Sequence, residues 1–322
     1  MTTRTAKVLS AGQGEWLSWL GHPVRYMATG EDSNEAYALS WDTLPAGGGP
    51  PAHRHTFLEG FFILKGEATF TAGNASVVLS AGGFINIGSG TAHYLRNHAA
   101  SEAEVLVLVS PAGFDRFQRE AGHPIASPSE ALGEPGVDDF EKMQAIAPKF
   151  GIDLSPPPAA FQEPPQIKVT PTGEGRRIAV FRSIYRFLTT GEDTNGGYAI
   201  WEASVPPAGG PPLYAQSREN VGFYLLEGEL VFQTDDQTIR ATSGTFLNLP
   251  PGVRHTFRND SQTTARMLSL VAPAGMERMF EETGVVLTEA SATVPPVSPG
   301  EIERLRATAP KYGIEIFPQA HE

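Results

Sequence analysis

Three histidines and one glutamate fall at spacings that could place them around a single metal ion. His53 and His55 are separated by one residue, Glu59 follows after a turn, and His93 lies in a later stretch of the chain. Side chains at positions i and i+2 of a strand point to the same face, so we expect both nearby histidines to project inward while Arg54 points outward. This donor set suits iron, manganese, cobalt, nickel, copper or zinc, and the sequence does not rank these ions.

The chain has no cysteine, which removes disulfides, thiolate nucleophiles and every cysteine-based metal site. A metal site must therefore be built from histidine and carboxylate groups. A single histidine in a strand is usually structural or on the surface. We expect this of four other histidines: His22, His98, His123 and His321.

The elements that must position these side chains occur twice. The stretch GEDSNEAYALSWDTLPAGGGPP, which starts at Gly30, recurs from Gly191 as GEDTNGGYAIWEASVPPAGGPP. The halves also end alike, because APKFGIDL at 147–154 matches APKYGIEI at 309–316. Such self-similarity indicates a tandem duplication of one fold. A length of 322 residues agrees with two domains.

The boundary between the copies is predicted in the proline-rich segment 155–166, because proline neither continues a helix nor serves a central strand. The domains are then 1–154 and 167–322. Within each half, short apolar runs alternate with glycine, as in FFIL, ATFTA, SVVLSAGG, FINI and EVLVLVS. These runs predict an all-β sandwich or small barrel. Two segments of the first half, 113–122 and 137–149, have helical patterns.

The second copy keeps its second histidine stretch but loses the first. His255 matches His93, whereas the other three ligand positions hold weak donors or none: Tyr214, Gln216 and Val221. Too few basic donors remain there to replace the water shell of a transition metal. We therefore expect one metal ion per chain and a supporting role, in folding or dimerisation, for the second domain. His255 is either a hydrogen-bonded core residue or the mark of a residual pocket.

The stretches 47–66 and 82–97 resemble the two conserved motifs of the cupin superfamily, with Gly88 where proline is usual. The resemblance implies two tandem cupin barrels of the double-stranded β-helix or jelly-roll type, with a few peripheral helices. It also implies that the metal ligands of the first barrel are His53, His55, Glu59 and His93. By strand parity, Phe61, Ile63 and Leu95 should face the cavity.

The duplication and the stretches HRHTFLEGFFILKGEATF, AGGFINIGSGTAHYLRN and PAGFDRFQREAG look like bicupin quercetin 2,3-dioxygenases. The resemblance implies a dioxygenase that cleaves a flavonol-like enolic substrate with O2 and releases carbon monoxide. Glu59 would be the catalytic base for the substrate hydroxyl, with its pKa lifted toward working pH by burial. The gap between His55 and Glu59 has three residues, where such bicupins more often have four.

Other functions remain open, because cupins with this ligand set include other dioxygenases, isomerases, decarboxylases and non-catalytic small-molecule binders. The formal net charge of −12 argues against a nucleic acid or an anionic membrane as partner. No apolar run approaches the ~20 residues that span a bilayer, and the N-terminus lacks a signal core, so we expect a cytoplasmic location. The resemblance also implies a homodimer acting on a small aromatic substrate.

Overall fold

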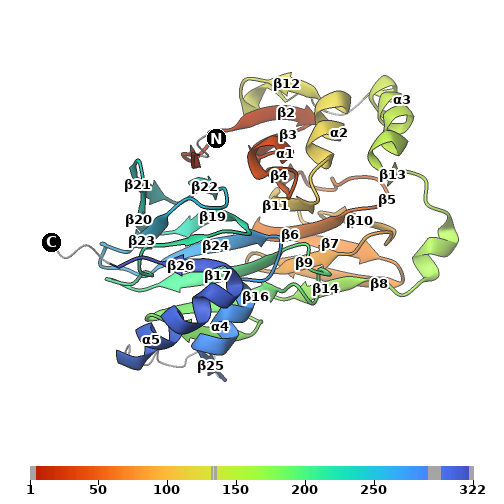
Figure 1. Ribbon diagram of the computed structural model, residues 1–322. Coiled ribbons are helices and arrows are strands. Elements are labelled where there is room, and N and C mark those ends of the chain that lie inside the picture. Colours follow the sequence, from red (N-terminus) through yellow and green to blue (C-terminus); the bar gives the residue numbers. More distant parts are fainter. Residues whose placement is uncertain (1–4, 132, 134–135, 289–298, 319–322) are drawn as a thin grey trace. The chain divides into compact units, whose positions relative to one another are not determined.

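The computed structural model describes residues 5–131, 133, 136–288 and 299–318 (Figure 1). These residues form two compact units. We call Gly14–Glu174 the N-terminal unit, and the described residues of Met1–Gln13 and Gly175–Glu322 the C-terminal unit. Each unit contains one copy of the sequence repeat, and each is described separately below.

The N-terminal unit is built from antiparallel strands in a large sheet of order β12-β2-β3-β4-β11-β6-β9-β14 and in two smaller sheets of order β10-β7-β8 and β13-β5. An isolated bridge between His53 and His93 links the smaller sheets. The strands are β2 (Glu15–Trp19), β3 (His22–Ala28), β4 (Ala38–Leu44), β5 (Arg54–His55), β6 (Leu58–Lys65), β7 (Glu67–Ala72), β8 (Ala75–Ser80), β9 (Phe84–Ile87), β10 (His93–Arg96), β11 (Ala103–Ser110), β12 (His123–Ile125), β13 (Ile152–Asp153) and β14 (Ile167–Thr170).

The apolar core of this unit lies between its sheets. Phe61 and Ile85 from the large sheet pack in one cluster with Phe70 and Leu95 from the smaller one. A second cluster joins the large sheet to the helices through Phe117 and other residues. The helical segments are α1 (Gly30–Ser33), α2 (Phe114–Ala121), η1 (Pro128–Glu130), α3 (Val137–Ile146), η2 (Ala147–Phe150) and η3 (Pro158–Gln162). Both helices expected from the sequence are thus confirmed.

The C-terminal unit repeats this plan with a large sheet of order β1-β22-β19-β24-β17-β16-β15-β25 and a smaller sheet of order β21-β20-β23-β18-β26. Its core again joins both sheets, for example through Phe223 and Phe232. Its elements are β1 (Lys7–Leu9), β15 (Arg177–Val180), β16 (Ser183–Thr189), β17 (Ala199–Val205), β18 (Tyr214–Gln216), β19 (Asn220–Glu227), β20 (Glu229–Thr234), β21 (Thr238–Thr242), β22 (Phe246–Leu249), β23 (His255–Arg258), β24 (Ala265–Ala272), α4 (Glu277–Thr283), β25 (Val285–Leu287), α5 (Pro299–Thr308), η4 (Ala309–Tyr312) and β26 (Ile314–Ile316). Figure 1 shows α4 and α5 in contact, outside the sheets.

The expected all-β jelly-roll architecture with peripheral helices is therefore confirmed in both units. The boundary between them differs from the expected one. Strand β14 pairs with β9, so the N-terminal unit continues past the proline-rich segment to Glu174, while β1 from the start of the chain pairs with β22 of the C-terminal unit. In the proline-rich segment, Ala160 is buried and Phe161 contacts the ring of Tyr94. Prolines stop helices and central strands, but they do not prevent a segment from packing on a surface.

None of the described helices is both long and apolar enough to cross a membrane.

Candidate metal centre

Strand pairing brings the four sequence-predicted residues of the N-terminal unit together. His53 and His93 face each other across a bridge with backbone hydrogen bonds of 2.9 and 2.8 Å in the two directions. His55 is on the short strand β5, and Glu59 is on β6 of the large sheet. The three-residue gap between these two side chains still lets the carboxylate reach the histidines. Arg54 points away from the site and pairs with Asp153, as strand parity predicts.

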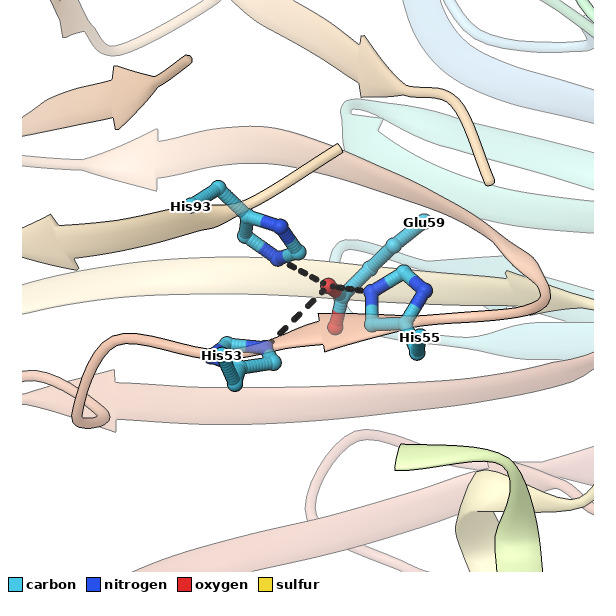
Figure 2. A group of neighbouring side chains, drawn as sticks. All are labelled: His53, His55, Glu59 and His93. Carbon is cyan, nitrogen blue, oxygen red and sulfur yellow. Dashed lines mark hydrogen bonds and ion pairs between the residues drawn. The ribbon is translucent and has the colours of Figure 1, made fainter. Parts of the chain in front are cut away.

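The donor atoms of the four side chains lie within 4.8 Å of one another, and all four residues are buried. Glu59 Oε2 is 2.9 Å from His55 Nε2, 3.0 Å from His93 Nε2 and 4.0 Å from His53 Nε2. Figure 2 shows the three imidazole rings turned toward this carboxylate. The arrangement could hold one metal ion. Among the described residues it is the one group of three or more side chains that could do so.

Backbone carbonyls fix the orientation of each ring. The Nδ1 atoms of His53, His55 and His93 lie 2.8 to 2.9 Å from the carbonyl oxygens of Pro51, Phe57 and Thr91 respectively. A carbonyl oxygen only accepts, so each Nδ1 must carry a proton. In a neutral imidazole, Nε2 then has a free lone pair. Nε2 is therefore the atom that can bind a metal. The side chain of Phe57 stacks on His55 with ring centroids 3.9 Å apart and holds that ring in place.

The electrostatics of the cluster call for a cation. Burial, reinforced by the neighbouring His93, lowers the pKa of His53 to about 3, so this ring is neutral near pH 7. Burial alone would raise the pKa of Glu59, but the side chains of His55 and His93 outweigh burial and hold that pKa below its usual range. Three imidazole nitrogens and a carboxylate oxygen converge in this buried site, and a positive ion among them would be attracted by all four donors. The residues present therefore fit a bound metal ion.

The expectation that burial lifts the pKa of Glu59 is wrong. The sequence predicts that the histidines and Glu59 share one site, but not that the Nε2 atoms of His55 and His93 lie within hydrogen-bond distance of the carboxylate. Their effect on the pKa is larger than that of burial, and Glu59 is ionised near neutral pH.

Two of the four donor residues, His53 and Glu59, lie at the wall of a largely apolar cavity. Its lining includes His53 and Glu59 together with residues of the strands, helices and turns around them: Trp19, Leu20, His22, Asp42, Leu44, Pro50, Pro51, Phe61, Leu95, Val105, Val107, Phe114, Phe117, Gln118, Met143, Ile152 and Leu154. Phe61 and Leu95 were expected in the cavity, and this is confirmed. Ile63 does not line the cavity and lies in the apolar core instead.

Three polar lining residues were not predicted as site residues from the sequence: His22, Asp42 and Gln118. They lie on β3, β4 and α2, none of which carries a recognisable ligand motif. His22 was expected to be a structural or surface residue, and it is instead part of the cavity wall. Of the other lone histidines, His98 and His123 are exposed as expected, and His321 lies outside the described residues.

The matching positions of the C-terminal unit form a different environment. Tyr214 packs on His255 with ring centroids 4.3 Å apart. His255 donates from Nδ1 to the carbonyl of Val253, but its Nε2 and the amide of Gln216 are buried without a hydrogen-bond partner. Burial lowers the pKa of His255 to about 4. In the part of this unit that the structure describes, no cluster of metal-binding side chains occurs.

Comparison with known proteins agrees with this duplicated arrangement. The family model described as "Cupin domain" matches the chain twice, over residues 40–109 and 201–271. The chain is also 24% identical to quercetin 2,3-dioxygenase of Bacillus subtilis (strain 168) over 289 residues, which cover 86% of this chain and 85% of that protein.

Solved structures show the same fold at lower sequence identity. An oxalate decarboxylase of Lactobacillus farciminis, in a formate complex, has a TM-score of 0.56 and 15% identity, covering 83% of this chain and 86% of that chain. Protein Ylba from E. coli has a TM-score of 0.57 and 13% identity, covering 85% of this chain and 94% of that chain. These likenesses establish the architecture of two repeated β-domains.

Proposed function

Because the chain is a bicupin, with two cupin domains in tandem, we propose that its N-terminal domain is a metal-dependent dioxygenase. Its substrate in this proposal is a flavonol-like enol, which is cleaved with O2 and releases carbon monoxide. The observation that carries the proposal is the set of four converging donors, two of which, His53 and Glu59, line an apolar cavity. The similarity to a bacterial quercetin 2,3-dioxygenase over most of both chains supports it.

In this proposal His53, His55 and His93 bind a divalent transition metal through Nε2, and Glu59 is the fourth ligand. When bound, the ion supplies Lewis acidity and open coordination positions for oxygen donors of the substrate. The carbonyl partners of the three Nδ1 atoms orient the rings for this role. The metal is one of iron, manganese, cobalt, nickel, copper or zinc, with one ion per chain.

Glu59 is also the proposed proton acceptor. Its Oε2 atom faces the imidazoles, so Oε1 is left to accept the proton of the substrate's enolic hydroxyl. A carboxylate that is ionised at working pH and within reach of the hydroxyl can remove this proton as the enolate forms. The apolar walls exclude water around the reacting groups.

The cavity favours an uncharged aromatic substrate over a small dianion. Its described lining has aromatic and aliphatic side chains on most sides, such as Trp19, Phe61 and Phe114, and contains neither arginine nor lysine. A dianion such as oxalate would lose its hydration shell there without a cationic side chain to replace it. A planar, mostly apolar enol instead gains from burial in such a pocket.

Turnover of quercetin by the metal-loaded protein tests the proposal. We expect loss of the flavonol absorbance band with matching uptake of O2, and no loss without oxygen. The His93→Ala variant should lose this activity, and His255→Ala, the matched change in the other domain, should keep it. Failure to consume any flavonol with any of the six metals would contradict the dioxygenase, and tight binding without turnover would assign a binding protein instead.

The homodimer and the cytoplasmic location expected from the sequence stay predictions.

A further inference from the structure

Asp42 places a second carboxylate in the metal-side cavity. It lies on β4, near the middle of the large sheet, and it is half-buried at the cavity wall. Ser40, on the same face of the strand, donates a hydrogen bond of 2.5 Å to its Oδ1 atom. Within the described part of the chain this is the one hydrogen bond to the Asp42 carboxylate, which leaves Oδ2 without a hydrogen-bond partner in a residue that lines the cavity.

The sheet register separates Asp42 from Glu59 along the cavity wall. Asp42 pairs with Val105 of β11, and Glu59 of β6 pairs with Val109 of the same strand, so both side chains project from one face of the sheet. Four residues along β11 correspond to roughly 13 Å, and the two strand spacings between β4 and β6 add roughly 10 Å across the sheet. The backbone positions of the two acids are thus well apart along the wall, while both side chains line the same cavity and the charge of Glu59 acts on Asp42.

An ionised carboxylate beside apolar walls is costly unless a donor satisfies it. Burial raises the pKa of Asp42 to about 7; the Ser40 hydroxyl opposes this shift and the Glu59 charge adds to it. The other polar side chains of the cavity do not neutralise Asp42: Gln118 accepts from Tyr26, and burial lowers the pKa of His22. A hydrogen-bond donor on a bound molecule would satisfy Oδ2.

The internal repeat provides a comparison for this residue. The position that matches Asp42 in the C-terminal domain is Ala203, and the position that matches Ser40 is Trp201. Ala203 is fully buried in the apolar core, and Trp201 lines the apolar cavity of that domain. The inward-facing acid and its hydroxyl partner are therefore present in the domain that has the metal ligands and absent from the domain that lacks them. A residue needed only to support the fold would be expected in both copies.

From these observations we infer that Asp42 is a specificity-determining residue. It accepts a hydrogen bond from a hydroxyl or amino group on the substrate, at the end remote from the group that binds the metal. The inference rests on the proposed function and narrows its substrate class to flavonols that carry further hydroxyl groups on their outer rings. Such a residue selects by leaving a buried acceptor unpaired when the donor is missing.

Ligand binding by the metal-loaded full-length protein, measured without oxygen, tests this role. The probes are 3-hydroxyflavone, which has only the metal-binding hydroxyl, and quercetin, which has additional hydroxyls. At pH 8, above the pKa of Asp42, we expect wild-type protein to bind quercetin at least about ten-fold more tightly, since a hydrogen bond to a charged group is worth about that factor. Asp42→Ala should reduce this preference to about two-fold or less, with unchanged metal content. The matched control is Asp138→Ala, an exposed aspartate on α3, which should keep the full preference.

If Asp42→Ala binds both flavonols but keeps the wild-type preference for quercetin, the proposed role of Asp42 is overturned. If neither flavonol binds to the wild-type protein, the proposed function itself fails, and the inference fails with it. Should the alanine variant not fold, Asp42→Asn keeps the side-chain volume and the acceptor for Ser40. It should still lower the preference at least about three-fold, since the charge of the acceptor is lost; an unchanged ratio in this variant would likewise overturn the inference.

Discussion

Two histidines at matching positions of the repeat meet different surroundings. His93 and His255 are both fully buried and both donate from Nδ1 to the carbonyl two residues earlier. The Nε2 atom of His93 faces Glu59, whereas Nε2 of His255 lies without a partner beside Tyr214. The second domain therefore retains the backbone geometry around this histidine. It lacks the neighbouring side chains that would complete a metal site.

His255 should make stability fall in mild acid. Its pKa is about 4 in the folded protein and 6.5 in the unfolded chain, so the unfolded chain binds more protons between these values. The stabilisation is complete above pH 6.5 and is lost as the pH falls toward 4, with a slope of up to about 1.4 kcal/mol per pH unit. The measurement is the free energy of unfolding of the C-terminal domain from pH 7 to pH 4.

The His255→Gln variant is the control for this prediction, because glutamine does not titrate. Its unfolding free energy should depend less on pH in this range. An equal pH dependence in both proteins would show that His255 is not buried as a neutral side chain.

The sequence was sufficient to predict those site residues whose positions follow the two-residue period of a strand. His53 and His55 follow from a period of two, and Phe61 follows from the same parity. Asp42 and His22 could not be found this way, because a single strand does not show which of its faces lines a cavity; for Asp42 this depends on the pairing of β4 with β11, which is distant in sequence. Ile63 shares a strand face with Phe61 but lies deeper in the core, since parity gives a face and not a depth.

At the level of elements, the loop before the first metal ligand depends on a close backbone contact. Gly49 has a φ of +144°, and a Cβ atom there would lie 2.1 Å from the carbonyl oxygen of Leu95 on β10. Gly210 has the same contact with Phe257 in the other domain. The glycine therefore sets how closely this loop approaches the strand that begins with His93.

Gly49→Ala should destabilise the N-terminal domain by about 3 kcal/mol or more, through backbone strain and the clash with β10. Gly47 has a φ of +74° and open space around a Cβ atom, so Gly47→Ala should cost only about 1 kcal/mol. Urea unfolding of both variants measures the difference. Equal effects would mean that the contact between Gly49 and Leu95 is not close.

At the level of the whole molecule, the chain is a duplication, and the large sheet of each unit has an edge strand that local sequence does not predict. Strands β1 and β14 pair with β22 and β9, and a three- or four-residue edge strand carries too few residues to show a period. This is why the fold class and the repeat could be predicted while the boundary between the units could not. The proline-rich segment is a local feature, and the pairing of β14 is not.

Deletion of residues 1–13 should therefore weaken the C-terminal domain and leave the metal site intact. It removes the β1–β22 pairing and the packing of Ala6 and Val8 on the core of that domain. We expect a loss of about 2 kcal/mol from this burial and the strand hydrogen bonds. Calorimetry of the truncated protein, beside its metal content, measures both effects. A fall in metal content with unchanged stability of the C-terminal domain would contradict this assignment.

In the proposed function the two domains share a fold, and the N-terminal domain alone holds a metal. Elemental analysis of purified wild-type, His93→Ala and His255→Ala proteins tests it most directly. We expect about one ion per chain in the wild type and in His255→Ala, and at least about ten-fold weaker metal binding in His93→Ala. About two ions per wild-type chain, or full metal content in His93→Ala, would contradict it.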